Sequence, residues 1–350
     1  MDNTTGRLKG FAMAIRPTLN PLTKPRPMSL IFPSPLVTIG EVNSLVCLSR
    51  LGKVWRAWLR RLFIGTCLIA FSGNMEIVGA AAALSRHNFQ TSDGVTLSVL
   101  ETGQNHTKSR RLTIAFIPGW SMPAYLWQRQ MEELGSRYHT LALDPRGQGE
   151  SQVPSFGYTA ERRATDLRDF LQPLSNVLLI GWSLGAIESL QYVEMFGSQR
   201  LAGLVLVDSS VGEEPAPPSG GTFTRRLREN RDQTLNEFVH AIFSKPRPEE
   251  EIESLVLGAK RMDLEDSLAL LSYPFERTHW KRIAYGFKKP LLYVVTPQFE
   301  KQAQNLKKNR PGTQIEVFKT AGHALFVDEP QRFNDLILRF AESLSPPQRK

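Results

Sequence analysis

From His87 onward, short apolar runs alternate with longer amphipathic segments, and this alternation constrains the fold more than any other feature. Most of the runs are rich in Val, Ile and Leu, as expected for strands buried on both faces. The segments between them are long enough for the crossover helices that parallel strands need. We therefore predict an α/β fold with a mostly parallel sheet and helices on both faces. The predicted strands are 95–100, 112–117, 140–143, 177–180, 204–207, 291–295 and 314–318, and the predicted helices are 127–134, 159–174, 186–196 and 330–344.

The segment 211–286 interrupts this alternation. It opens with a linker rich in Pro, Gly and Ser at 215–221, and it continues with amphipathic stretches near 225–243 and 249–271. No run in it has the pattern of a strand. We therefore predict a helical insertion over the sheet, which divides the core into a first part, 86–210, and a second part, 287–350.

The net charge of +9 is concentrated at the N-terminal end. Residues 1–85 contain ten Lys or Arg and three Asp or Glu, a net charge of +7, so the rest of the chain carries only +2. Cys47 and Cys67 also lie in this segment, so the predicted domain has no thiol. A nearly neutral domain gives no reason to expect a nucleic-acid partner.

Residues 1–85 are typical of a leader. A basic stretch at 50–61 precedes an apolar run at 62–71 and small residues at 78–83, which is the order of a secretory signal peptide. About fifty residues precede the basic stretch, which is unusual for such a signal. A membrane anchor at 62–84 and an organellar transit peptide remain as alternatives. A signal or an anchor would export the domain, to the periplasm or outside the cell, or hold it there at a membrane through 62–84 only.

A candidate nucleophile follows the predicted strand 177–180. Ser183 lies in a Gly-x-Ser-x-Gly pattern between Gly181 and Gly185, and a predicted helix begins directly after it. A sharp turn from strand to helix exposes the serine hydroxyl, and it needs small residues two positions before and two after the serine. The context therefore favours a catalytic serine over a buried turn residue.

Two further segments fit a nucleophilic serine. His323 follows the last predicted strand and is preceded by Gly322, a position suited to a general base. Trp120 follows the strand 112–117, so its backbone N–H is a candidate donor to an oxyanion, with the N–H of Leu184 as the second donor.

Together with Pro118-Gly119 before Trp120 and the run 144–151 after the strand 140–143, these segments resemble the α/β-hydrolase superfamily over residues 86–345. The resemblance implies an eight-stranded sheet, a helical cap after the sixth strand and Ser-His-acid chemistry without a cofactor. It also implies that Asp144 and Arg146 brace neighbouring loops. Pro118 stands where many members have His, which leaves the oxyanion N–H in place. The matching segments are Pro118-Gly119-Trp120, 144–151, 181–185 and Gly322-His323.

The acid of the triad departs from the family pattern. In most relatives an Asp follows the seventh strand, but here 291–295 continues into Thr296 and a segment without Asp. Asp208, at the end of the strand 204–207, is the first candidate because a strand-end residue points at the site. Glu300 is the alternative, and we expect it at the beginning of a helix.

The predicted activity is acyl transfer to water from a small ester-like substrate, which is a carboxylic ester, a lactone or a thioester. Alternatives are a perhydrolase or acyltransferase with the same triad, and a ligand-binding module with a slow triad. No phosphate-binding or nucleotide-binding motif and no metal-ligand cluster is present, so we expect no cofactor and no metal. Candidate pocket residues are Trp182, Phe238, Phe243, Met262 and Tyr273.

Overall fold

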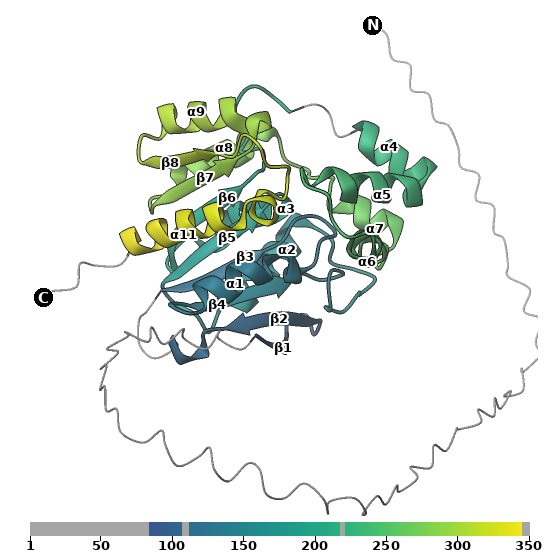
Figure 1. Ribbon diagram of the computed structural model, residues 1–350, viewed down its shortest axis with the longest axis horizontal. Coiled ribbons are helices and arrows are strands. Elements are labelled where there is room, and N and C mark those ends of the chain that lie inside the picture. The colour runs from purple at the N-terminus through teal and green to yellow at the C-terminus, as the bar shows by residue number, and fades with distance from the viewer. Residues whose placement is uncertain (1–83, 107–111, 218–220, 345–350) are drawn as a thin grey trace, which may run out of the picture. The chain divides into compact units, whose positions relative to one another are not determined.

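A computed structural model describes residues 84–106, 112–217 and 221–344 (Figure 1). These residues contain an eight-stranded sheet in the order β1-β2-β4-β3-β5-β6-β7-β8. β2 pairs antiparallel with β1 and with β4, and the other pairs are parallel. This confirms the predicted α/β class and the mostly parallel sheet. The strands are β1 (Ser85–Gln90), β2 (Thr96–Thr102), β3 (Thr113–Ile117), β4 (His139–Asp144), β5 (Val177–Trp182), β6 (Leu201–Val207), β7 (Leu291–Val295) and β8 (Thr313–Val317).

Helices cover both faces of the sheet. Every residue of β3, β4, β5 and β7 is buried, which explains why these strands have no alternation of polar residues. Apolar residues of α1 and α11 pack in the core on one face, and those of α2, α3, α8 and α9 pack on the other. The helices of the core are α1 (Gln128–Leu134), α2 (Ala160–Leu171), α3 (Leu184–Phe196), α9 (Glu300–Asn309), α10 (Leu325–Asp328) and α11 (Pro330–Leu344), with 3-10 turns η1 (Gln104–His106), η2 (Ala124–Trp127) and η3 (Pro297–Phe299).

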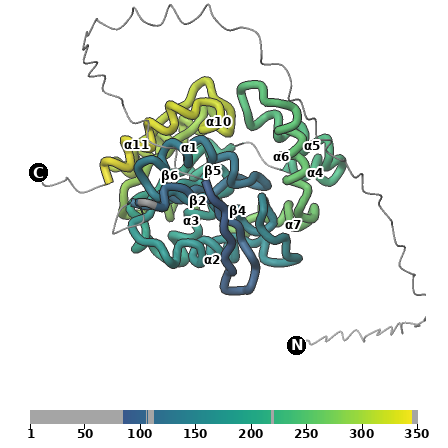
Figure 2. The backbone as a smooth tube through the Cα atoms, turned by 60° about the horizontal axis from the view of Figure 1, so that its bottom comes forward, coloured from purple at the N-terminus to yellow at the C-terminus, as the bar shows by residue number. Residues whose placement is uncertain are grey.

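The described residues between β6 and β7 form five helices and no strand. Figures 1 and 2 show that α4 to α7 gather at one end of the sheet. The predicted helical stretch 225–243 is divided in two, because the side chain of Asn230 accepts a hydrogen bond from the Gln233 N–H and so begins a new helix. The five helices are α4 (Gly221–Glu229), α5 (Arg231–Ala241), α6 (Glu249–Ala259), α7 (Leu264–Ala269) and α8 (Arg277–Gly286).

The N-terminal edge strand β1 was not among the predicted strands. Most of its residues are exposed and it lacks a run of apolar side chains, so its sequence has no strand pattern. Leu84, directly before it, packs against the core. The leader proposed for residues 1–85 lies outside the described residues except for Leu84 and Ser85. Among the residues that are described, none of the helices is both long and apolar enough to cross a membrane.

Candidate active site

Ser183 occupies a strained turn between β5 and α3. Its φ of 54° and ψ of −116° lie in a region that residues with a side chain rarely adopt. The backbone N–H of Ser183 donates to the carbonyl of Val207 over 2.8 Å, so the turn is fixed against the end of β6. This is the strand-turn-helix geometry that the Gly-x-Ser-x-Gly pattern predicts.

The two glycines of the pattern are required by close backbone contacts. A Cβ atom at Gly181 would lie 2.3 Å from the carbonyl oxygen of Gly185, and one at Gly185 would lie 2.6 Å from the carbonyl oxygens of Ile117 and Pro118. Neither position has room for a side chain, because the neighbouring atoms are backbone. The close approach of α3 to β3 and β5 thus depends on both glycines.

His323 and Asp208 are in direct contact. The Nδ1 atom of His323 lies 2.7 Å from Oδ2 of Asp208. The Asp208 side chain is 1% exposed and the His323 side chain is 28% exposed, so the pair has a buried and an accessible end. A carboxylate in this position can orient an imidazole and stabilise its protonated form. The structure therefore brings Asp208, His323 and the end of β5 together at the carboxyl edge of the sheet.

The second oxygen of Asp208 is held by Thr296, which follows β7. Oδ1 accepts hydrogen bonds from the Thr296 N–H over 2.7 Å and from its hydroxyl over 2.8 Å. Burial, together with the Asp208 carboxylate, raises the pKa of Tyr293 well above its ordinary value. Thr296 thus stands at the strand end where most relatives place the acid, and there it donates to Asp208, which follows the neighbouring strand β6.

Glu300 is the first residue of α9, as expected from the sequence. Its carboxylate accepts a hydrogen bond from the side chain of Gln304, one helical turn further on. Within the described ranges, no hydrogen bond or ion pair joins Glu300 to His323. The contact with His323 is made by Asp208.

The turn after β3 lies beside Ser183. A Cβ atom at Gly119 would be 3.1 Å from the Cβ of Ser183, so the backbone of this turn contacts the serine. Leu184 is the first residue of α3, and first-turn N–H groups have no partner within their own helix. The Leu184 N–H belongs to the residue that follows Ser183. The Trp120 N–H follows Gly119, whose backbone lies against the Ser183 side chain.

The loop that holds His323 is fastened to the end of α5. The Gly322 N–H donates to Oδ2 of Asp328 over 2.7 Å, and the same oxygen accepts from the N–H and hydroxyl of Ser244. On the other side of His323, the Ala324 N–H donates to the Ile242 carbonyl over 2.7 Å. Asp328 was not among the sequence-predicted site residues. Its signal in the sequence is weak, because Asp328 follows the apolar run 324–327 and is itself followed by Glu329.

The five proposed pocket residues do not pack as one group. The Trp182 ring is 5.2 Å from the His323 ring, and its indole N–H donates to the His323 carbonyl over 2.9 Å. Phe238 of α5 packs edge-on against Trp120 at 5.4 Å, together with Phe223 of α4.

The other three pocket candidates lie farther along the insertion. Phe243 lies beside the guanidinium of Arg247 and its backbone contacts Gly322. Met262 is buried against Gly147. Tyr273 packs on Trp280.

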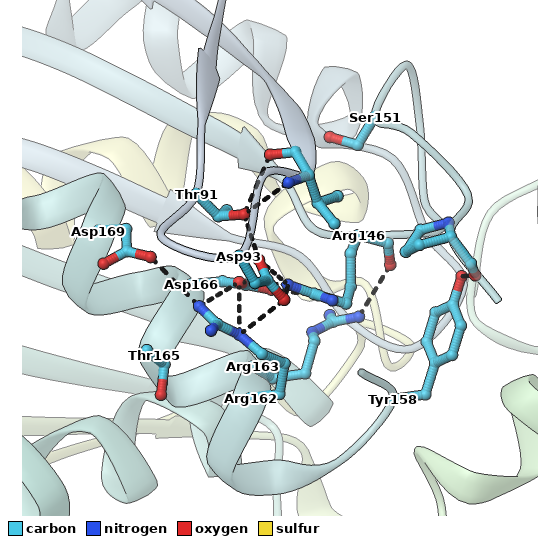
Figure 3. Close-up of polar contacts among 12 residues, drawn as sticks. Thr91, Asp93, Arg146, Ser151, Tyr158, Arg162, Arg163, Thr165, Asp166 and Asp169 are labelled. Atoms are coloured by element: carbon cyan, nitrogen blue, oxygen red, sulfur yellow. Dashed lines mark hydrogen bonds and ion pairs between the residues drawn. The ribbon is translucent and has the colours of Figure 1, made fainter. Parts of the chain in front are cut away.

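Asp144 and Arg146 brace loops, as the resemblance implied. Asp144 accepts from the Ala124 N–H over 2.6 Å and from the Glu150 N–H over 3.1 Å. Arg146 is fully buried and binds Asp166 and Asp93, at the centre of the cluster in Figure 3. In the portions of the chain that are described, no group of three or more His, Cys, Asp or Glu side chains has the arrangement of a metal site.

Comparison with known proteins identifies the family. A family model described as "Alpha/beta hydrolase family" matches residues 114–336. A Pimeloyl-[acyl-carrier protein] methyl ester esterase of Vibrio vulnificus is 26% identical over 270 residues, which cover 67% of this chain and 96% of that protein. An esterase from Exiguobacterium antarcticum has a similar fold, with a TM-score of 0.64 and 20% identity over 73% of this chain and 98% of its own. A bromoperoxidase from Bacillus anthracis has a TM-score of 0.65 and 19% identity over 74% of this chain and 100% of its own. The chain therefore belongs to the α/β-hydrolase family, with a hydrolase-type function.

Proposed function

We propose that the protein is a serine hydrolase that cleaves a small ester-like substrate through an acyl-enzyme on Ser183. In this mechanism His323 accepts the proton of the Ser183 hydroxyl, and the serine oxygen attacks the carbonyl carbon of the substrate. Asp208 orients the imidazole and stabilises its protonated form. The protonated His323 then gives its proton to the leaving alcohol as the carbon–oxygen bond breaks.

Deacylation repeats these steps with water as the nucleophile and Ser183 as the leaving group. His323 accepts a proton from water, the water oxygen attacks the acyl carbon, and Ser183 recovers its proton as the acid product leaves. The N–H groups of Trp120 and Leu184 are the proposed donors to the oxyanion in both steps. Backbone donors are already oriented before the reaction, so they stabilise the developing charge without rearrangement.

The observation that carries the proposal is the 2.7 Å contact between His323 and Asp208, at the edge of the sheet where Ser183 occupies the strained turn. The name of the Vibrio vulnificus relative, a methyl ester esterase, favours a carboxylic ester over a lactone or a thioester. The rings of Trp120, Phe223 and Phe238 pack together at the turn after β3, and they favour an apolar acyl or alcohol group in the substrate.

A fluorophosphonate probe and a series of p-nitrophenyl esters of increasing acyl length test this proposal. We expect covalent labelling at Ser183 and turnover of the shorter esters, with both lost in Ser183→Ala. Labelling without turnover would favour an acyl acceptor other than water, and absence of both would favour a ligand-binding module. Either result overturns the proposed hydrolysis.

We also propose that residues 1–85 direct the domain out of the cytoplasm. The support is the sequence order of basic, apolar and small residues, which precede the first strand. Cell fractionation and sequencing of the mature N-terminus test it. A mature chain that begins near 80–84 in an exported fraction is expected, and a cytoplasmic chain that retains 50–80 would contradict it.

A further inference from the structure

The side chain of Gln148 reaches from the turn after β4 to the turn after β3. Its amide nitrogen donates to the carbonyl of Gly119 over 2.9 Å and to the carbonyl of Met122 over 2.8 Å. Gln148 is fully buried, so these donors have no alternative partner in water. The Met122 N–H also donates to the Gly119 carbonyl, over 3.2 Å. Two donors therefore hold the Gly119 oxygen.

The Gly119 carbonyl and the Trp120 N–H belong to one peptide group. A trans peptide is planar, so its C=O and N–H bonds point in opposite directions and rotate together. Whatever fixes the Gly119 oxygen therefore also fixes the direction of the Trp120 hydrogen. If this peptide turned over, a carbonyl oxygen would replace the proposed oxyanion donor beside Ser183.

We propose that Gln148 is a positioning residue that holds the Gly119–Trp120 peptide with its N–H directed at the oxyanion. The inference rests on the proposed function, because it assigns Gln148 a role in the same oxyanion site. Gln148 acts through the peptide and makes no contact with the reacting atoms.

A buried ion pair holds Gln148 in turn. The Oε1 atom of Gln148 accepts a hydrogen bond from Arg163 over 3.1 Å, and the Arg163 guanidinium lies 2.8 Å from the carboxylate of Glu188. Arg163 also donates to the Arg146 carbonyl over 3.2 Å, as the dashed line in Figure 3 shows. Both charged side chains are almost fully buried. The turn after β3 is thus connected through Gln148 to Arg163 of α2 and Glu188 of α3.

The chemistry of this position requires an amide. The side chain must donate to two carbonyl oxygens and accept from one guanidinium, and a glutamine has two N–H donors and an acceptor oxygen. A glutamate would direct an oxygen at the two carbonyls, and a methionine of similar size would leave them without a side-chain donor. The neighbouring Gly149, with a φ of 51°, permits this tight turn, because a Cβ there would overlap the Asp144 carboxylate.

The test compares Gln148→Met and Gln148→Glu with the full-length wild type. The matched control is Gln191→Met, because Gln191 is also buried and hydrogen-bonded, but its partner is His279 of α8. Measurements are kcat and KM for p-nitrophenyl butyrate, the affinity for a trifluoromethyl ketone that adds to the serine, and the unfolding midpoint. We expect kcat to fall by about 10²-fold, as for loss of an oxyanion donor, with KM nearly unchanged. The ketone affinity should fall by a similar factor.

A purely structural role for Gln148 would lower the unfolding midpoint but leave kcat and the ketone affinity of the folded protein near those of Gln191→Met. That result would overturn the inference. If Gln148→Met does not fold, Gln148→Asn, which keeps the amide but shortens its reach, makes the same comparison. An active wild type with unaffected variants overturns this inference alone, whereas a wild type without labelling or turnover overturns the proposed function and the inference with it.

Discussion

The Nδ1 atom of His323 lies 2.7 Å from the carboxylate of Asp208, which directly follows β6, although the acid of most relatives follows the neighbouring strand, β7. The other oxygen of the same carboxylate accepts two hydrogen bonds from Thr296, at the end of β7. The two strand ends thus share one function between them. β6 supplies the charge, and β7 supplies the donors that keep it directed at the histidine.

Asp208→Asn should therefore lose most of the activity. An asparagine retains the shape but can no longer stabilise the protonated imidazole, so we expect kcat to fall by about 10⁴-fold. Glu300→Gln is the matched control, since the hydrogen bond of the Glu300 carboxylate with Gln304 lies within its own helix. Steady-state kinetics on p-nitrophenyl butyrate measure both. A large loss in Glu300→Gln with a nearly active Asp208→Asn would reverse the assignment of the acid.

Thr296→Val should weaken the same site without abolishing it. The variant removes the hydroxyl donor to Asp208, 2.8 Å away, and retains the N–H donor. Hydrogen bonds to charged groups contribute about 1.5–3 kcal/mol, so we expect the free energy of unfolding to decrease by about that amount. We expect kcat to fall about tenfold, because the carboxylate oxygen is then held by one donor in place of two. Thr296→Ser retains the hydroxyl and should be close to wild type in chemical denaturation and in turnover.

The sequence predicted the sheet well because its central strands are buried on both faces and appear as unbroken apolar runs. It also predicted the turn at Ser183, because the signal is a local one: both glycines lie two residues from the serine, between an apolar strand and a helix. The edge strand β1 has no comparable signal, since most of its side chains are exposed. A hydrophobic pattern cannot indicate a strand whose side chains are mostly exposed.

The partners of the site residues could not be predicted in the same way. The contact between Asp208 and His323 joins positions 115 residues apart, and those of Gln148 with Gly119 and Arg163 also join separate elements. A sequence pattern indicates that a position is buried or turns sharply, but it does not show which buried polar groups satisfy one another. Asp328 directly follows an apolar run, which is a weak signal, whereas Arg163 stands among other charged residues of α2 and has none.

The glycines of the strained turn lead to a third prediction. In Gly185→Ala, the new methyl group would lie 2.6 Å from two backbone oxygens of β3 and the residue after it, so α3 must move away from the sheet. We expect a loss of stability of about 1–3 kcal/mol, typical of overpacking, with loss of fluorophosphonate labelling at Ser183. Gly258→Ala is the control. Gly258 lies in α6 with no atom within 4 Å of the added methyl, so the free energy of unfolding of this variant should rise by about 0.5–1 kcal/mol.

The pH dependence of stability should contain a contribution from Glu188. Burial raises the pKa of Glu188 from 4.5 to about 7, even though Arg163 favours the charged form. The folded protein thus holds this proton more tightly than the unfolded chain does. The contribution of this proton to the free energy of unfolding is fully present below pH 4.5. It decreases as the pH rises and is lost once the pH passes about 7.

Urea unfolding of the wild type and of Glu188→Gln, measured across this pH range, isolates the contribution, because the glutamine cannot ionise. The stability of the wild type relative to the variant should fall by about 3 kcal/mol between the two pKa values and change little at higher pH. A difference that stays constant with pH would mean that Glu188 ionises alike in the folded and unfolded states. Because Arg163 binds Gln148 as well as Glu188, the kcat of the wild type should be followed over the same range. Loss of this proton strengthens the ion pair, which keeps Arg163 in place.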